Sequence, residues 1–197
     1  MDTIEAFLQV LDPNDNSTGG GTASALAGAM AAALAAMVAR LSLGKGLDAS
    51  EAAYRQVSAT GETLAAELAA GAAQDAKAFA AVKAAYRLPR ETAEQKAARA
   101  QAIQAAMINA ARVPLHNAGL CLRVLELVGL LEGRSNPDAL SDLQCACYLA
   151  RAGLDGCLAN VAINLSAIKD PAVMSAINEQ VRALRALARS GGCTEAA

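Results

Sequence analysis

The side chain best placed by the sequence to do chemistry is Asp75, within the segment GAAQDAKAFAAVKAAYRLP. Helical residues three and four apart share one face, and Asp75 shares its face with a mostly apolar row: Leu68, Ala72, Phe79, Val82 and Tyr86. No lysine or arginine occupies positions 71, 72, 78 or 79. A carboxylate in apolar surroundings has a raised pKa, which suits proton transfer or binding of a cationic substrate. The structural alternative is an aspartate at the edge of the stripe, capped or paired across helices.

A second polar set lies on one face of the segment SNPDALSDLQCACYLARAGLDGCLANVAINL: Asp142, Cys145, Leu149, Gly153, Gly156, Asn160 and Asn164. The two glycines allow another helix to approach closely. Asn160 and Asn164 are one helical turn apart, so their amides could bracket a heteroaromatic ring or bond one another. Buried amides more often satisfy neighbouring backbone groups, and that alternative stays open.

A third candidate is the turn from Thr18 through Gly19, Gly20 and Gly21 to Thr22, directly before an alanine-rich segment. Free N–H groups and the helix dipole favour an anion at a helix N-terminus. The turn is not a phosphate-binding Walker loop, because the Gly-Lys-Ser/Thr sequence is absent. It could equally be a simple turn that leads into the helix.

Composition predicts the framework that positions these residues. Of the 197 residues, 54% are hydrophobic and only 3% are aromatic, and alanine dominates. This favours an all-α, single-domain helical bundle spanning residues 1–197, with a frayed tail at 191–197. The 17 basic and 19 acidic residues leave a net charge of −2, so neither nucleic acid nor an anionic membrane is an expected partner.

Helix signals divide the chain. Asp48 with Glu51, and Thr92 with Gln95, form capping-box patterns, and Pro114, Pro137 and Pro171 each suit the first turn of a helix. The expected helices cover about 2–11, the alanine-rich stretch up to Gly44, 49–88, 92–112, and three more that begin at Pro114, near Pro137 and at Pro171. We expect Gly61 and Gly71 to bend the second long helix.

Residues 16–39 carry no charged side chain and are numerous enough to span a bilayer. Alanine and glycine partition weakly into lipid, so we favour a buried core helix. Its large residues form one stripe (Leu26, Met30, Leu34, Met37 and Leu41), and a second row is small (Gly20, Ser24, Gly28 and Ala32). The small row predicts close packing against another backbone.

The five cysteines, 121, 145, 147, 157 and 193, lack the spacing of a disulfide framework, and the chain begins without an export signal. A cytoplasmic protein is the expectation. Cys145 and Cys147 should point in nearly opposite directions on a helix and act as small hydrophobic residues. The single histidine, His116, has no partner at metal-ligand spacing, so no metal is expected.

Taken in order, five stretches resemble the cyclodeaminase domain of formiminotransferase-cyclodeaminase and its stand-alone methenyltetrahydrofolate cyclohydrolase relatives. They are STGGGTASALAGAMAAALAAMVARLSLGKG, QDAKAF, YRLPRETAEQKAAR, VPL, and the stretch from SNPDALSDLQ to NVAINLSAIKD. The resemblance covers residues 5 to 190. It implies an all-helical folate enzyme, a homodimer or higher homo-oligomer with the pterin near subunit contacts, and a tetrahydrofolate derivative as substrate without a covalently bound cofactor.

Asp75 falls on the family's acidic D-x-x-A-F position, which implies a catalytic role. Asp142 and Asn160 would orient the pterin, with Asn164 supporting them. The Gly19–Gly21 turn would meet a carboxylate of the folate's glutamate or shape the pocket wall, and Lys45 would assist substrate binding as the one basic residue between Gly44 and Gly46.

The resemblance leaves two reactions open. SDLQ and INLSAIKD look closer to the deaminase domain, so formimidoyltetrahydrofolate cyclodeaminase, forming 5,10-methenyltetrahydrofolate and ammonia, is preferred. Methenyltetrahydrofolate cyclohydrolase is the alternative. A non-catalytic helical oligomerisation module is a third reading, because small residues at four-residue steps also suit self-association.

Overall fold

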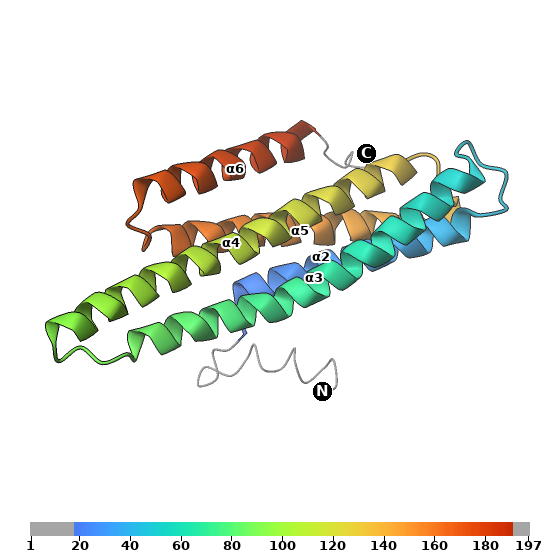
Figure 1. The fold of residues 1–197 in the computed structure, drawn as a ribbon. Helices are drawn as coiled ribbons and strands as arrows, with labels where there is room; N and C mark the ends of the chain where they lie inside the picture. The colour runs from blue at the N-terminus through green and yellow to red at the C-terminus, as the bar shows by residue number, and fades with distance from the viewer. Residues whose placement is uncertain (1–17, 191–197) are drawn as a thin grey trace.

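The computed structural model describes residues 18–190. These form five α-helices and one short 3₁₀ helix: α2 (Gly20–Ser42), α3 (Glu51–Tyr86), α4 (Ala93–Leu131), η1 (Pro137–Ala139), α5 (Leu140–Leu165) and α6 (Pro171–Ser190). Helices α2 to α5 lie side by side, and α6 runs along the outside of the bundle (Figure 1). No strand occurs in residues 18–190, which confirms the all-α fold. The helix predicted at 2–11 and the predicted frayed tail at 191–197 lie outside the described residues.

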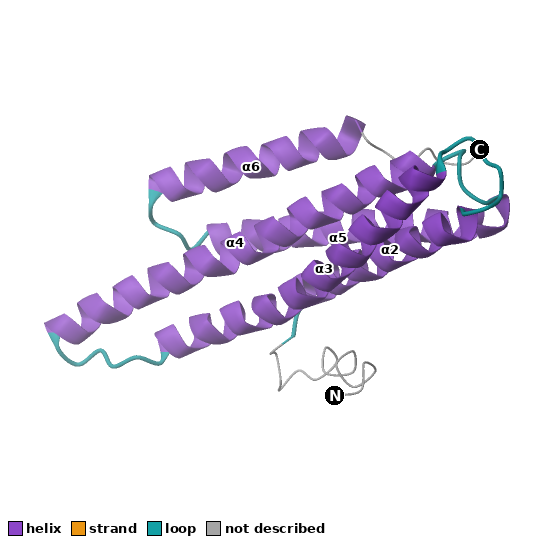
Figure 2. Ribbon diagram, turned by 45° about the vertical axis from the view of Figure 1, so that its right-hand side comes forward, coloured by secondary structure: helices purple, strands orange, loops and turns teal. Residues whose placement is uncertain are grey.

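Several helix ends agree with their sequence signals. The Thr92 side chain accepts from the Gln95 backbone N–H at 3.2 Å, and the Gln95 side chain accepts from Thr92 N–H at 3.2 Å, which completes the predicted capping box. Pro137 begins η1 and Pro171 begins α6, as expected. Figure 2 shows the α3–α4 loop at one end of the bundle and the α2–α3 and α4–α5 loops at the other.

Two predictions about helix boundaries are wrong, those at Asp48 and at Pro114, whereas the predicted bend at Gly61 and Gly71 stays a prediction. The N-cap of α3 is Ser50, whose hydroxyl accepts from Ala53 N–H at 3.2 Å, and Asp48 does not cap the helix. Glu51 instead accepts from Gly44 N–H at 2.7 Å, which holds the preceding loop. Helix α3 runs unbroken through Gly61 and Gly71, and α4 continues through Pro114 to Leu131. Tertiary packing of these long helices outweighs the local signals that would end them.

Helix α2 packs through its small residues. A methyl group added at Gly28 would lie 2.5 Å from Cys121 Sγ, and one added at Gly61 of α3 would lie 2.9 Å from the carbonyl of Ala32. The predicted close approach is therefore confirmed. In the stripe of large residues, Met30 is 43% exposed and Leu41 is 45% exposed, whereas Leu26, Leu34 and Met37 are half-buried and Leu34 packs against the core.

Two apolar clusters hold the fold together. The larger one joins α2, α3, α4 and α5 and contains fully buried Leu64, Leu68, Val124 and Leu154. The smaller one joins α4, α5 and α6 around Leu115, Val161 and Ile177, and it attaches α6 to the bundle. Burial of these side chains supplies most of the favourable free energy of folding.

Two of the described helices, α2 and α4, are long and apolar enough to cross a membrane. In each, half or more of the apolar window is buried inside the bundle, 50% for α2 and 61% for α4, as in core helices of soluble proteins. The expectation of no membrane partner stays a prediction.

Candidate functional site

The candidate site forms where α2 begins against the C-terminal half of α3. The first turn of α2 contains Gly20, Gly21 and Thr22, and it lies directly over the Asp75 carboxylate. A Cβ atom at Gly21 would sit 2.6 Å from both carboxylate oxygens of Asp75. Only glycine at position 21 allows this approach, because real Cβ atoms do not reach that distance without displacing their neighbour.

Thr22 holds the Asp75 carboxylate in place. Its hydroxyl donates to Asp75 Oδ2 at 3.0 Å, and its backbone N–H also donates to the carboxylate. Burial raises the pKa of Asp75 above its ordinary value of 3.8, and the two Thr22 donors oppose this rise without cancelling it. A half-buried carboxylate with an upward-shifted pKa is a stronger base than an ordinary aspartate and is suited to accept and return a proton.

Asp75 stands at the boundary between the core and the surface of α3. Leu68 and Ala72, before it on the predicted stripe, are buried, whereas Phe79 and Tyr86, after it, are exposed. Helix α2 begins at Gly20, beside Asp75, so no part of α2 packs over the stripe residues of α3 that follow Asp75. The predicted apolar stripe is therefore buried on the side of Leu68 and Ala72, and its exposed side gives solvent access to Asp75.

Asn160 and Asn164 reach the same place from the last turns of α5. Asn164 Nδ2 donates to Asn160 Oδ1 at 3.3 Å and to the backbone carbonyl of Ala110 on α4 at 2.8 Å. A methyl group at Gly20 would lie 3.6 Å from Asn160 Nδ2, which places this amide beside the start of α2. The two amides bond one another and Asn164 also satisfies a backbone carbonyl, so both structural alternatives that the sequence left open occur.

These groups enclose a cavity of about 260 Å³. Its lining comes from all four bundle helices and the residues just before α2: Thr18, Gly19, Gly21, Asp75, Ala78, Phe79, Ala110, Asn160, Ile163 and Asn164. Phe79 is 40% exposed and Ile163 is 73% exposed, so two apolar side chains form an open rim around polar groups. This volume lies below the usual range for a drug-sized ligand and suits one ring system, with the rest of a longer ligand outside.

The glycine turn has a different role from an external anion site. Gly19 is the N-cap of α2, and Gly19 and Gly21 line the cavity wall. The anion that the N-terminus of α2 receives within this chain is the carboxylate of Asp75 itself, bound to Thr22 N–H. Of the two roles predicted for the turn, the geometry favours the pocket wall over contact with a ligand carboxylate.

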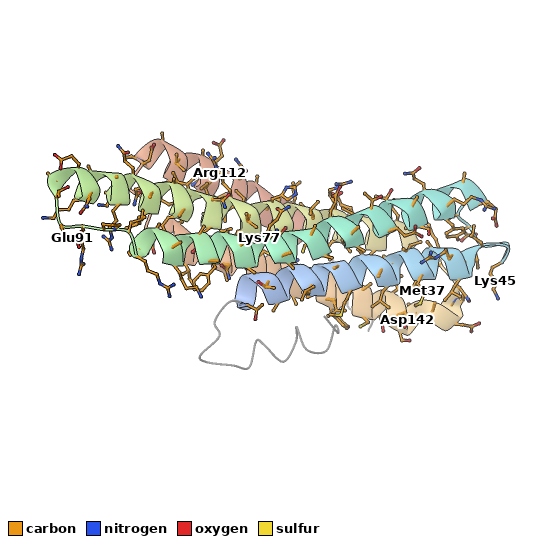
Figure 3. The ribbon with its side chains drawn as sticks, turned by 60° about the horizontal axis from the view of Figure 1, so that its bottom comes forward. Met37, Lys45, Lys77, Glu91, Arg112 and Asp142 are labelled. Atoms are coloured by element: carbon orange, nitrogen blue, oxygen red, sulfur yellow. The ribbon has the colours of Figure 1, made fainter. Side chains whose placement is uncertain are left out.

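Two predicted site residues lie elsewhere in the chain's own fold. Asp142 is near the beginning of α5, 18 residues before Asn160, or about 27 Å along the helix. Lys45 follows the far end of α2. Figure 3 shows both toward the end of the bundle at which α2 finishes, away from the start of α2. Because α2 and α5 run antiparallel over their full lengths, one protomer does not bring Asp142 or Lys45 to Asp75.

The described cysteines do not supply a nucleophile to the site. Cys121, Cys145 and Cys157 are free thiols. A hydrogen bond with Cys121, together with burial and the nearby charge of Asp75, raises the pKa of Cys157, which keeps this thiol neutral. Cys145 is exposed and Cys147 buried, as their helical spacing predicted, whereas Cys193 lies outside the described residues.

A larger cavity of about 800 Å³ lies between α4 and α6, with Arg112, His116 and Arg123 as its cationic and imidazole groups. No predicted site residue lines it, and none of its lining side chains is a carboxylate. Within residues 18–190, no three His, Cys, Asp or Glu side chains gather as a metal site would require. The absence of a metal cofactor stays a prediction.

The sequence patterns predicted no site role of their own for three contributors, although Thr22 ends the predicted glycine turn. Thr22 is three residues after the N-cap, a position whose N–H and hydroxyl both point beyond the helix start, so the motif contained a usable signal. Ile163 lies between the two asparagines and faces outward. Ala110 offers only a backbone carbonyl, which no residue-type pattern could reveal.

The fold and the site define a helical-bundle protein with one half-buried carboxylate and two amides around a ring-sized cavity. The family model described as formiminotransferase-cyclodeaminase matches residues 3–183. The chain therefore belongs to the formiminotransferase-cyclodeaminase family, and the predicted resemblance and enzyme class are confirmed.

Relatives of two kinds stand out. The chain is 38% identical over 195 residues to a methenyltetrahydrofolate cyclohydrolase of Methylorubrum extorquens, covering 98% of this chain and 93% of that protein. It is 30% identical over 186 residues to the formimidoyltransferase-cyclodeaminase of Mus musculus, covering 93% of this chain but 34% of that protein. A crystal structure of formiminotetrahydrofolate cyclodeaminase from Thermotoga maritima matches with a TM-score of 0.85 and 26% identity, covering 97% of this chain and 91% of that one.

Proposed function

We propose that this chain is a folate one-carbon enzyme that hydrolyses 5,10-methenyltetrahydrofolate to 10-formyltetrahydrofolate. The observation that carries the choice of reaction is the 38% identity to a methenyltetrahydrofolate cyclohydrolase over nearly the whole of both chains. This reverses the preference drawn from the SDLQ and INLSAIKD motifs. The tetrahydrofolate derivative is substrate, and no bound cofactor takes part in the proposal.

In this proposal Asp75 is the catalytic residue. Its ionised carboxylate lies beside the methenyl carbon, whose positive charge is shared between N5 and N10, and stabilises that cation. Asp75 then accepts a proton from water as the water oxygen bonds to the methenyl carbon. The bond from that carbon to N5 breaks, N5 takes a proton, and the formyl group remains on N10 with net release of one proton.

The second candidate is formimidoyltetrahydrofolate cyclodeaminase, favoured by the structural match to the Thermotoga maritima enzyme. N10 would attack the formimino carbon on N5 and pass its own proton to the former imino nitrogen, which takes one further proton and leaves as ammonia as the methenyl cation forms. Asp75 in its protonated form would supply that proton, and a raised pKa increases the protonated fraction at neutral pH. Both reactions thus use one carboxylate next to one delocalised cation.

The remaining residues bind and orient. The pterin ring enters the 260 Å³ cavity between Asp75 and the amides of Asn160 and Asn164. The aminobenzoyl-glutamate part extends outward past Phe79 and Ile163, whose exposed apolar side chains suit an aromatic linker. Gly19, Gly20 and Gly21 form the wall that keeps α2 close to the ring.

The assembly in this proposal is a homodimer or higher homo-oligomer in the cytoplasm, without nucleic acid or membrane. Its support is the outer face of α2 and α5, where Met30, Leu41, Leu140 and Tyr148 are all exposed large apolar residues. Large apolar side chains that gather on the surface of a soluble protein often mark a protein–protein interface. A second copy of the same chain covers it with the self-complementary contact typical of two-fold symmetry.

Methenyltetrahydrofolate absorbs in the near ultraviolet, so one spectrophotometric assay tests the function. Loss of that absorption above the uncatalysed rate supports the cyclohydrolase, and its appearance from formiminotetrahydrofolate supports the cyclodeaminase. We expect Asp75→Asn to fold normally and to turn over about a hundredfold or more slowly. Asp155→Asn, an exposed carboxylate paired with Arg151 on α5, is the matched control and should retain activity.

Two outcomes contradict the proposal. Full activity in Asp75→Asn removes this residue from the mechanism. Wild-type protein that acts on neither folate and binds no tetrahydrofolate supports the non-catalytic oligomerisation module instead.

A further inference from the structure

A proline inside α4 leaves one backbone acceptor without its helical donor. In an α-helix each N–H donates to the carbonyl four residues earlier. Pro114 lies within α4 and has no N–H, so the carbonyl of Ala110 receives no bond from position 114. A buried carbonyl without a partner is costly, and some other donor normally replaces the missing one.

The replacement comes from the site. Asn164 Nδ2 donates to the Ala110 carbonyl at 2.8 Å, across the contact between α5 and α4. A carbonyl oxygen only accepts, so the amide of Asn164 must turn its nitrogen toward Ala110 and its oxygen away. The same nitrogen also donates to Asn160 Oδ1 at 3.3 Å, which fixes the orientation of the second amide in turn.

This chain of bonds decides the polarity of the cavity. These bonds do not use two of the amide atoms. One is Asn160 Nδ2, which is a donor, and the other is Asn164 Oδ1, which is an acceptor. Ala110, Asn160 and Asn164 all line the cavity that contains Asp75. Reversal of either amide would exchange donor and acceptor without any change of residue.

We propose that Pro114 is a positioning residue, which frees the Ala110 carbonyl to lock Asn164 and Asn160 as an ordered acceptor and donor pair beside Asp75. The inference deepens the proposed function and rests on it for the ligand. A neighbouring acceptor and donor match the edge of a cyclic amide, which has its own N–H and C=O side by side, as the pterin ring does. The pair therefore selects ring orientation and leaves proton transfer to Asp75.

The proposal makes stability and activity move in opposite directions. Proline in a helix interior removes a bond and strains the preceding turn, so Pro114→Ala should restore a regular helix and unfold at the same or a higher temperature. The backbone N–H that this substitution introduces at position 114 competes with Asn164 for the Ala110 carbonyl, and the amides lose their fixed orientation. If Pro114 served only to stabilise the fold, Pro114→Ala would instead lower the melting temperature.

The experiment combines Pro114→Ala, Asn164→Ala and the double variant in steady-state kinetics on the folate that wild type uses. We expect Pro114→Ala to raise KM about 3- to 10-fold, the scale of one neutral hydrogen bond, with kcat within about twofold of wild type. Adding Pro114→Ala to Asn164→Ala should have no further effect on KM, because Pro114 acts through Asn164. Pro171→Ala, at the first turn of α6, is the matched proline control and should change neither constant.

Additive effects of the two substitutions, an unchanged KM in Pro114→Ala, or a lower melting temperature with reduced kcat would each overturn the proposal. If wild type acts on neither folate, the proposed function fails separately. The side-chain amide of Asn164 then decides the positioning role by NMR. Its Nδ2 proton shifts and exchange protection should change in Pro114→Ala and remain unchanged in Pro171→Ala, and unchanged signals in both variants would disprove the role.

Discussion

At the scale of single residues, the site depends on the contact between one carboxylate and the first turn of one helix. Thr22 donates to Asp75 through its hydroxyl and its backbone N–H, and both bonds favour the ionised form. Burial favours the neutral form more strongly, so the pKa of Asp75 is raised. The protonation state of this carboxyl is therefore adjustable through Thr22 without any change in Asp75 itself.

Thr22→Val removes the hydroxyl donor and keeps the shape of the side chain. The pKa of Asp75 should rise further, because the ionised form loses one bond. In the hydrolytic reaction Asp75 acts ionised, so the acidic limb of the kcat/KM profile should move to higher pH in Thr22→Val. Thr22→Ser keeps the donor and should leave the limb near its wild-type position. If the acidic limb does not move in Thr22→Val, ionisation of Asp75 does not determine the pH dependence of kcat/KM.

The same shift predicts how Asp75 affects stability. The folded-state pKa is raised, so its contribution is fully present below the unfolded pKa near 3.8 and is lost as pH rises through the folded pKa. Relative to Asp75→Asn, wild type should gain stability as the pH falls through this interval. Denaturant melts of both proteins over a pH series measure the difference, and a constant difference would contradict the raised pKa.

Gly21→Ala tests the close contact directly. The new methyl group would lie 2.6 Å from both oxygens of Asp75, so the carboxylate must move and its bond to Thr22 must break. We expect a loss of kcat approaching that of Asp75→Asn. Gly20→Ala meets only Asn160 Nδ2 at an ordinary 3.6 Å and should lose far less activity. Equal activity in the two alanine variants would mean that the contact does not position Asp75.

Sequence periodicity found Asp75, Asn160 and Asn164 because one-dimensional spacing determines which residues share a helix face. It grouped Asp142 with Asn160, since both lie on one face of α5. Two residues on the same helix face can still lie far apart along the helix axis, so they need not contact the same part of a neighbouring helix. Tertiary packing places the start of α2 opposite Asp75. Only this packing determines that the end of α5 with Asn160 lies at the site and that the end with Asp142 does not.

At the scale of helices, glycine sets how closely the bundle packs. A methyl group at Gly153 of α5 would lie 2.8 Å from the Ser24 carbonyl and 3.1 Å from Gly28 N on α2. Gly153→Ala must therefore separate α2 from α5 or distort them, at a cost of about 1–3 kcal/mol. Gly129→Ala on α4 meets nothing within 4 Å and should stabilise by up to about 1 kcal/mol through helix propensity. Chemical denaturation of both variants measures these opposite signs.

Helix boundaries were predictable where both halves of a local signal were present, as at Thr92 and Gln95. They failed at Pro114, because a proline that usually starts a helix is tolerated inside one when another residue satisfies the freed carbonyl. That residue, Asn164, is 54 positions away from Ala110. No local pattern contains a bond of that sequence separation.

At the scale of the whole molecule, the stripe of large residues on α2 is better explained as a contact surface than as the core face of the helix. Leu26, Met30, Leu34, Met37 and Leu41 follow helical spacing as a core face would, yet the buried face of α2 consists mostly of alanine, and Leu34 alone of the five packs against its edge. Periodicity identifies an apolar face and not its partner. Since helix α2 is apolar on both faces, one face serves the bundle and the other remains for a second copy of the chain in the proposed homodimer.

Two-fold symmetry across this face would also account for Asp142. On α5, Asp142 precedes the exposed Ala152 by ten residues, and Asn160 and Asn164 follow it by eight and twelve. A two-fold axis near Ala152, perpendicular to α5, would place Asp142 of one copy beside the asparagines of the other. The proposed role of Asp142 in orienting the pterin is then compatible with its distance from Asp75 within one chain.

Mixed dimers test this arrangement. Asp75→Asn and Asp142→Asn chains with different affinity tags are co-expressed, and dimers that carry both tags are purified. Each such dimer would combine one site that lacks both carboxylates with one site that has both, so activity should return to about half the wild-type value. If Asp142 served a site within its own chain, each site would lack one carboxylate and the mixed dimer would stay as inactive as its parents. Full activity of the Asp142→Asn homodimer would exclude Asp142 from either arrangement, and a monomeric wild type by light scattering would exclude the shared site altogether.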